Sequence, residues 1–462
     1  MISIEAIIVI VAWLTGYALL MLLKPSTESL CAGMWAGWLF LPHVKVDLPG
    51  LTVDKVACVT IVTAFAVAIL PSSRRGSIRF TVLDIPLWIF LSAIFLSSIS
   101  NELGSYDGFV TALKFFVSFG IPWYIGKVVF STPENRNVLI RISILAGLAY
   151  VPFCLFEMKM APILHTTIYG YGARGARGEN LGMTALRYGL WRPTVFMSYG
   201  LQTALMMGVL STIAFWRSRT KRLGTFIGIR NWQVAAILGL TTVFCVSSGA
   251  VVLTALGWVI VWLTSQNLRR AAIVSILVLL VSYPLYRMTH IGDLRIGISQ
   301  INSEADKRKA SLQTRIHSED VFLEKWLTRP LLGSTAWHYH QVSEDVPPDS
   351  MWILMLAKFG LVGWASWTLV LTSPIAYQLL DSSSLQNRDG TGFILSVATL
   401  IYASDCQFNA MDNPLYLVMA GAISLRNQTD RSAEPMDSPS ETLMRKRPPR
   451  ELWPRMELNV PS

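Results

Sequence analysis

The chain is a succession of apolar runs separated by short polar segments. Most runs approach the length of about 20 residues with which an α-helix crosses the hydrocarbon core of a bilayer. They show no strict alternation of apolar and polar residues, so the strands of a β-barrel are not indicated. The pattern predicts an all-α, polytopic membrane protein of about 12–13 transmembrane helices. The runs lie at about 6–23, 30–44, 56–70, 80–98, 109–130, 138–156, 194–215, 232–246, 250–264, 271–286, 351–371, 393–404 and 415–425.

The composition favours the same class of protein. Of the 462 residues, 52% are hydrophobic and 15% are charged, whereas a soluble globular chain carries roughly 25% charged residues. These values exclude a water-soluble globular fold, a collagen-like fibre and a disordered chain as descriptions of the whole sequence. The residues before the first run, Met1 to Glu5, include no basic side chain. We therefore expect that run to be an uncleaved span and not a signal peptide.

The positive charge is concentrated in the short loops between runs. The net charge is +10, and basic residues cluster at 74–79, 217–230 and 269–270 and in the tail at 445–450. The positive-inside rule assigns such segments to the cytoplasm. Counting spans places all four clusters on one side. The two longest polar segments, about 157–193 and 288–350, then fall on the external side. Nucleic acid is not needed as a partner to explain the basic excess.

This topology divides the chain into two parts. We expect residues 1–426 to form a transmembrane domain and 427–462, rich in Pro, Ser and charge, to be a disordered cytoplasmic tail that contacts membrane lipids. The larger external loop has helical spacing at 303–327 and is expected to carry amphipathic helices along the membrane surface. None of the five cysteines has metal-ligand spacing, so neither a disulfide framework nor a metal site is indicated.

The first external loop is unusually rich in arginine, with Arg174, Arg177, Arg187 and Arg192. Arginine on an external loop runs against the positive-inside bias. A guanidinium group presents a planar fork of donors that suits phosphate and carboxylate. The Gly-rich stretch 170–178 gives backbone N–H groups access to such a ligand, or is simply a flexible loop. A pyrophosphate is one ligand that this loop would suit.

The second external loop contains candidate bases. His338 lies in its middle, and Asp349 lies just before the next apolar run. Either side chain could accept a proton from a hydroxyl group. His338 and His340 would share a face only on a strand, and no further ligands are defined, so a metal is not expected. The residue types leave the base open between Asp349 and His338.

Several motifs in this region occur in the order of a known family. They are Arg192-Pro193-Thr194-Val195-Phe196, Val246-Ser247-Ser248-Gly249-Ala250, Arg315 with Trp326, Arg329-Pro330-Leu331-Leu332-Gly333, Asp349-Ser350 and Phe359-Gly360-Leu361-Val362-Gly363. Together they cover roughly residues 192–363, and their order and sidedness resemble the O-antigen ligase/polymerase superfamily of bacterial membrane glycosyltransferases. Two positions depart from the family pattern. Ser248 stands where an Arg is common, and Asp349-Ser350 stands where the ligases have a His-led pair, which favours a polymerase.

The resemblance implies a function and a mechanism. A polyprenyl-pyrophosphate-linked oligosaccharide would be the donor, and the hydroxyl of a glycan or lipid acceptor would attack its anomeric carbon. Neither a metal nor a nucleotide cofactor would be required, and other polysaccharide assembly proteins would be possible partners. The implied base is Asp349 or His338. The residues implied to contact the pyrophosphate or glycan are Arg177, Arg192, Arg315, Arg329 and Ser248.

Two other functions remain open from the sequence. A secondary transporter or lipid-linked-glycan flippase would use ionisable residues within spans. The main candidates for that role are Lys114, Arg141, Lys358 and Asp405. A non-catalytic scaffold of a polysaccharide export complex would be compatible with the Ser248 departure.

Overall fold

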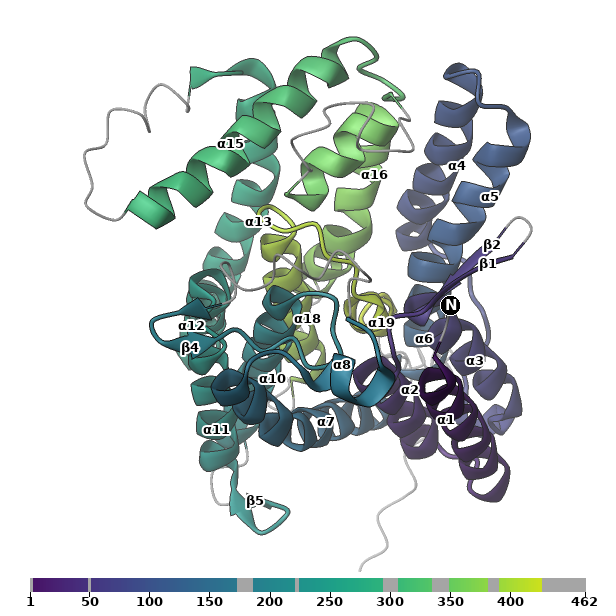
Figure 1. Ribbon diagram of the computed structural model, residues 1–462, viewed down its shortest axis with the longest axis vertical. Helices are drawn as coiled ribbons and strands as arrows, with labels where there is room; N and C mark the ends of the chain where they lie inside the picture. Colours follow the sequence, from purple (N-terminus) through teal and green to yellow (C-terminus); the bar gives the residue numbers. More distant parts are fainter. Residues whose placement is uncertain are drawn as a thin grey trace, which may run out of the picture. The chain divides into compact units, whose positions relative to one another are not determined.

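The computed structural model describes residues 3–48, 51–172, 186–220, 224–293, 306–334, 349–380 and 390–425. All of them belong to one unit, Met1–Arg426. The fold is all-α, as the sequence predicts (Figure 1). In the described ranges, strands occur only as three two-stranded antiparallel hairpins. The expected disordered tail, 427–462, lies outside the described residues.

The helices follow one another along the chain with short connections. In the first half they are α1 (Ile4–Leu23), α2 (Thr27–Phe40), α3 (Lys55–Ile69), α4 (Ile85–Ser100), α5 (Ser105–Phe115), α6 (Ile121–Val129), α7 (Pro133–Met160) and α8 (Leu164–Tyr169). In the second half they are α10 (Gly200–Thr220), α11 (Asn231–Phe244), α12 (Ser248–Trp262), α13 (Gln266–Thr289), α15 (Asp306–Leu327), α16 (Met351–Leu380), α18 (Thr391–Asp405) and α19 (Pro414–Ala422).

The hairpins and single turns lie between these helices. The hairpins pair β1 (Lys45–Leu48) with β2 (Leu51–Asp54), β3 (Leu186–Arg187) with β4 (Leu190–Trp191), and β5 (Thr225–Phe226) with β6 (Ile229–Arg230). Short 3₁₀ turns occupy Ser72–Arg74 and Val82–Asp84, and a π-helical turn at Phe116–Gly120 joins α5 to α6.

Every predicted apolar run coincides with a helix, and the protein is a membrane protein. Six helical segments among the described residues are long and apolar enough to cross a bilayer: Ile4–Leu23, Val82–Ser100, Ser105–Val129, Pro133–Met160, Gln266–Thr289 and Met351–Leu380. Four further apolar helices are shorter: Lys55–Ile69, Asn231–Phe244, Ser248–Trp262 and Thr391–Asp405. The remaining runs form α2, α10 and α19. They are also helical, but α2 and α19 are short and α10 ends in basic residues.

Glycines allow some of these helices to approach closely. At the crossing of α6 and α19, a Cβ on Gly126 would collide with the carbonyl oxygen of Val418. A Cβ on Gly421 would collide with that of Trp123. Small residues at helix crossings let backbones pack tightly, which is how helices associate where lipid removes the hydrophobic driving force.

The helix α15 confirms the predicted amphipathic segment at 303–327. It lies across the ends of α13 and α16 (Figure 1). Its inward face buries Ile316, Leu323 and Trp326. Buried ion pairs attach it to α13, because Arg287 on α13 contacts Glu319 at 2.9 Å and Asp320 at 2.8 Å. The position of α15 is therefore set by both packing and charge.

Candidate functional site

The structure describes five of the seven predicted site residues. Arg192 lies between β4 and α10, Ser248 begins α12, Arg315 lies on α15, Arg329 follows α15, and Asp349 precedes α16. The other two, Arg177 and His338, lie outside the described residues, as does most of the Gly-rich stretch 170–178.

The Arg192 side chain is held against the turn between α11 and α12. Its Nη2 donates a hydrogen bond of 3.0 Å to the carbonyl oxygen of Val246. A Cβ on Gly200 would lie 2.5 Å from Cγ of Arg192, so only glycine leaves room for this side chain at the start of α10. Burial lowers the pKa of Arg192 to about 10, and the positive charges of Arg187 and Arg315 act in the same direction. Arg192 therefore stays charged at neutral pH, close to two other cations.

Arg315 reaches from α15 to the residues that follow α18. Its Nη2 donates to Oδ1 of Asn409 at 3.4 Å, and Nδ2 of Asn409 donates to Oδ1 of Asp405 at 2.7 Å. Asp405 is buried at the end of α18. The asparagine thus connects the predicted cation on α15 with a carboxylate that the sequence placed near the end of a span.

The Asp349-Ser350 pair packs against the same end of α18. The backbone N–H groups of Met351 and Trp352 donate to the carbonyl oxygen of Cys406, at 3.0 and 3.3 Å. Burial raises the pKa of Asp349, and the charge of Arg315 opposes this shift. A carboxylate with a raised pKa is a better proton acceptor near neutral pH than an exposed one. Arg315 thus acts on the pKa of Asp349 as well as on that of Arg192.

Asp412, between α18 and α19, is a further ionisable residue that the motif analysis missed. Its side chain is exposed to solvent, and nearby protein atoms that displace part of its hydration raise its pKa to about 6. Asp54 raises that pKa further, while Lys114 and Lys358 lower it. Nε2 of Gln202 donates to the Asp412 carbonyl oxygen at 3.0 Å and ties this loop to α10. The polar gap between the last two runs was the sequence signal for it.

Two predicted residues have other neighbours. Nη1 of Arg329 donates to the carbonyl oxygen of Ser100 at 2.6 Å and to Oδ1 of Asn101 at 2.8 Å, so this arginine binds the end of α4. Ser248 is exposed in the turn that follows Val246, the hydrogen-bond partner of Arg192. Arg329 is thus engaged in a structural contact with the end of α4. Ser248 lies two residues after the hydrogen-bond partner of Arg192.

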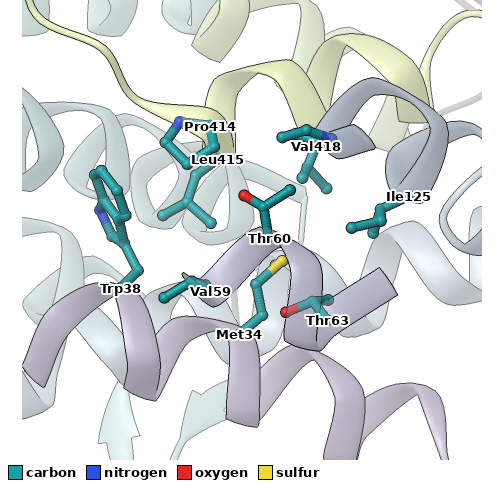
Figure 2. Close-up of a pocket in the computed structure, with 10 residues that line it drawn as sticks. Met34, Trp38, Val59, Thr60, Thr63, Ile125, Pro414, Leu415 and Val418 are labelled. Atoms are coloured by element: carbon teal, nitrogen blue, oxygen red, sulfur yellow. The ribbon is translucent and has the colours of Figure 1, made fainter. Parts of the chain in front are cut away.

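An apolar pocket lies between α2, α3, α6 and α19. Figure 2 shows Trp38, Met34 and Val59 facing Leu415 and Val418 across it, with the Trp38 indole nitrogen and the hydroxyl groups of Thr60 and Thr63 as polar side-chain atoms. No charged side chain is among the residues that line it. This pocket therefore lacks the groups that would hold an anionic head group.

The comparisons with known proteins leave the family open. No protein-family model matches the chain, and no curated protein matches it either. Among the described residues, no group of three or more His, Cys, Asp or Glu side chains is placed to hold a metal ion. The fold and the charged groups together define an all-α, polytopic membrane protein with arginines and carboxylates gathered around the ends of α16 and α18.

Proposed function

We propose that the chain is a plasma-membrane glycosyltransferase that polymerises or ligates polyprenyl-pyrophosphate-linked glycan units for a surface polysaccharide. Its donor is a lipid-linked oligosaccharide, and its acceptor is a glycan or lipid hydroxyl. The site faces the outside of the cell, and the tail is cytoplasmic, in agreement with the distribution of basic loops. The bond energy arrives with the donor, so the reaction requires no nucleotide.

The observation that carries this proposal is that Arg315 acts electrostatically both on Arg192 and on the Asp349 carboxyl group. Neither Arg192 nor Arg315 has a salt-bridge partner within 4.0 Å among the described residues. Like charges held near each other raise the free energy of the unliganded protein, and a bound anion offsets that cost. A pyrophosphate supplies the negative charge and oxygen atoms that a guanidinium fork binds well.

The carboxylate gives the site a route for the proton. The acceptor hydroxyl loses its proton to Asp349, and its oxygen bonds to the anomeric carbon. The bond between that carbon and the phosphate oxygen breaks, and the polyprenyl pyrophosphate leaves with the electron pair. Arg192 and Arg315 stabilise the charge that develops on the leaving group. Asp349, where the ligases have a His-led pair, favours polymerisation over ligation.

The test is glycan output from a deletion strain complemented with the wild type, Arg315→Ala, Asp349→Ala or Arg141→Ala. Arg141 is the matched control, because it forms a half-exposed ion pair with Glu28 at 3.7 Å. Surface polysaccharide is separated by length, and lipid-linked intermediates are extracted in parallel.

A polymerase predicts loss of long chains and accumulation of single lipid-linked units in the Arg315 and Asp349 variants only. A ligase predicts long lipid-linked chains that never reach their final acceptor. Unchanged glycans in well-expressed Arg315 and Asp349 variants would reject the proposal and favour a transporter or scaffold.

A further inference from the structure

A buried carboxylate near the C-terminal end of α7 holds the chain next to Arg192. The Glu157 side chain is completely buried and accepts three backbone hydrogen bonds. Its Oε1 accepts from the N–H of Leu164 at 2.9 Å. Its Oε2 accepts from the N–H groups of Thr194 and Val195, at 2.8 and 2.6 Å. Because one carboxyl group accepts from three separate backbone N–H groups, Glu157 ties residues 194–195 to the start of α8.

The fixed backbone is strained at Val195. Its φ of 53° lies in the left-handed region, which is unfavourable for a β-branched residue. Val246, whose carbonyl oxygen accepts the hydrogen bond from Arg192, has the same φ of 53°. Strained conformations persist only where the surroundings over-determine them, and they cluster at functional sites. Both strained valines are linked to Arg192, one by the chain and one by a hydrogen bond.

Other helices fix Phe196, the residue that follows Val195. The N–H of Phe196 donates to the Tyr150 hydroxyl at 2.9 Å, and Nζ of Lys55 donates to the Phe196 carbonyl oxygen at 2.8 Å. Both contacts hold the backbone of Phe196 and not that of Val195. Glu157 binds the N–H groups of Thr194 and Val195, while the Thr203 hydroxyl and the Met197 N–H donate to the Thr194 carbonyl oxygen, at 3.0 and 2.9 Å. Arg192 is only two residues before Thr194.

We propose that Glu157 is a positioning residue, which holds the strained 194–195 backbone so that the Arg192 guanidinium is fixed in place to bind a pyrophosphate. This inference rests on the proposed function, because it assigns Arg192 to that anion. Preorganised donors bind an anion without paying the ordering cost at the moment of binding. Without the carboxylate, Val195 relaxes to an ordinary conformation and Arg192 loses its fixed direction.

The experiment measures binding of inorganic pyrophosphate to the purified full-length protein by calorimetry. The variants are Arg192→Ala, Glu157→Gln, their combination, and Glu157→Gln with Val195→Gly. Glu157→Gln replaces an acceptor oxygen with an NH₂ group that faces backbone donors, and we expect affinity to fall about tenfold. In the Arg192→Ala background the same change should have no further effect. Glycine adopts the left-handed region without strain, so Val195→Gly should restore part of the affinity.

Asp84→Asn is the matched control for a buried carboxylate. Asp84 is also completely buried, and its carboxylate accepts from Nε1 of Trp123 at 2.8 Å and from the N–H of Thr81 at 2.6 Å, far along the chain from Arg192. We expect this variant to lose thermal stability and keep its affinity for pyrophosphate. If Glu157→Gln alone does not fold, the Val195→Gly background provides the comparison.

The outcomes separate the two proposals. If Arg192→Ala weakens binding and Glu157→Gln does not, the role of Glu157 is overturned and the proposed function stands. Equal losses from Glu157→Gln with and without Arg192 also overturn it, because they indicate a general structural effect. If the wild type does not bind pyrophosphate, or if Arg192→Ala binds it like the wild type, the proposal that Arg192 binds this anion is rejected. The positioning role of Glu157 is then rejected as well.

Discussion

Gly333 and Gly360 lie against each other so closely that neither can carry a side chain. A Cβ on Gly333 would be 2.5 Å from the backbone nitrogen of Gly360, and a Cβ on Gly360 would collide with the backbone of Leu331. Both have positive φ angles, of 75° and 66°. The N–H of Leu361 donates to the Pro330 carbonyl oxygen at 2.8 Å. The Arg-Pro-Leu-Leu-Gly and Phe-Gly-Leu-Val-Gly motifs therefore form one interlocked unit, which breaks α16 at Gly360.

Replacing Gly360 with alanine should strongly destabilise the protein. Its φ of 66° with ψ of −166° belongs to a region that essentially only glycine adopts. The strain costs about 1–3 kcal/mol, to which the collision with Leu331 adds. Thermal unfolding of the detergent-solubilised protein measures the loss. Gly16→Ala on α1 is the control, because a Cβ there meets nothing within 4 Å, and a helical alanine is favoured. Equal melting temperatures for Gly360→Ala and the wild type would contradict the packing.

The ion pairs between α13 and α15 give a second prediction. Arg287 is completely buried and is the shared partner of Glu319 and Asp320. Arg287→Ala leaves two buried carboxylates without their cation, a change that costs about 3–5 kcal/mol. We expect α15 to detach, and hydrogen exchange along it to rise. Glu324→Gln on the same helix is the control, because that side chain is exposed. Unchanged protection of α15 in Arg287→Ala would show that apolar packing alone holds this helix.

The helices were predictable because each element contains its own signal. The apolar runs needed no knowledge of their neighbours, and the helical spacing at 303–327 was sufficient to predict α15. The break within α16 was not predicted. Gly360 lies in an apolar run whose one charged residue is Lys358, and its conformation depends on contact with a segment almost thirty residues earlier.

The candidate site was only partly predictable for the same reason. Arg192 was found because arginine is unexpected in external loops, Arg315 through the order of motifs that resembles a known family, and Asp349 because it precedes a span. Glu157 carries no such signal, since a carboxylate after an apolar run is normally solvated. Its partners, Leu164 and Thr194, are brought to it only by folding.

The pKa of Asp412 predicts a pH-dependent stability. Partial loss of hydration beside other protein atoms, together with the charge of Asp54, raises this pKa from 3.8 to about 6 although the side chain is exposed. Between these two pH values the folded protein binds more protons than the unfolded chain, so the free energy of unfolding falls as the pH rises. The whole decrease in the free energy of unfolding is present above the folded pKa. Asp412→Asn removes this decrease. Its melting temperature should exceed that of the wild type at neutral pH, and the two should converge in acid. Asp107→Asn, at an exposed position on α5, is the control, and a difference independent of pH would reject the assignment.

Asp349 and Arg315 together predict the pH dependence of the proposed transfer reaction. Burial raises the pKa of Asp349, and the charge of Arg315 lowers it. A carboxylate base works only when ionised, so the rate should fall as the pH drops through this pKa. Arg315→Ala removes the nearby cation, the pKa of Asp349 rises, and the acid limb should move to higher pH.

The measurement is the rate of polymer formation against pH at saturating lipid-linked donor, since Arg315→Ala also weakens donor binding. Arg141→Ala should keep the wild-type profile, because its ion pair with Glu28 is half-exposed. Asp349→Asn should lose the transfer reaction across the whole pH range, because an amide cannot accept the proton. If the acid limb of Arg315→Ala does not move, then Asp349 is not the base whose ionisation limits the rate. His338, the other candidate base, is then the residue to replace next.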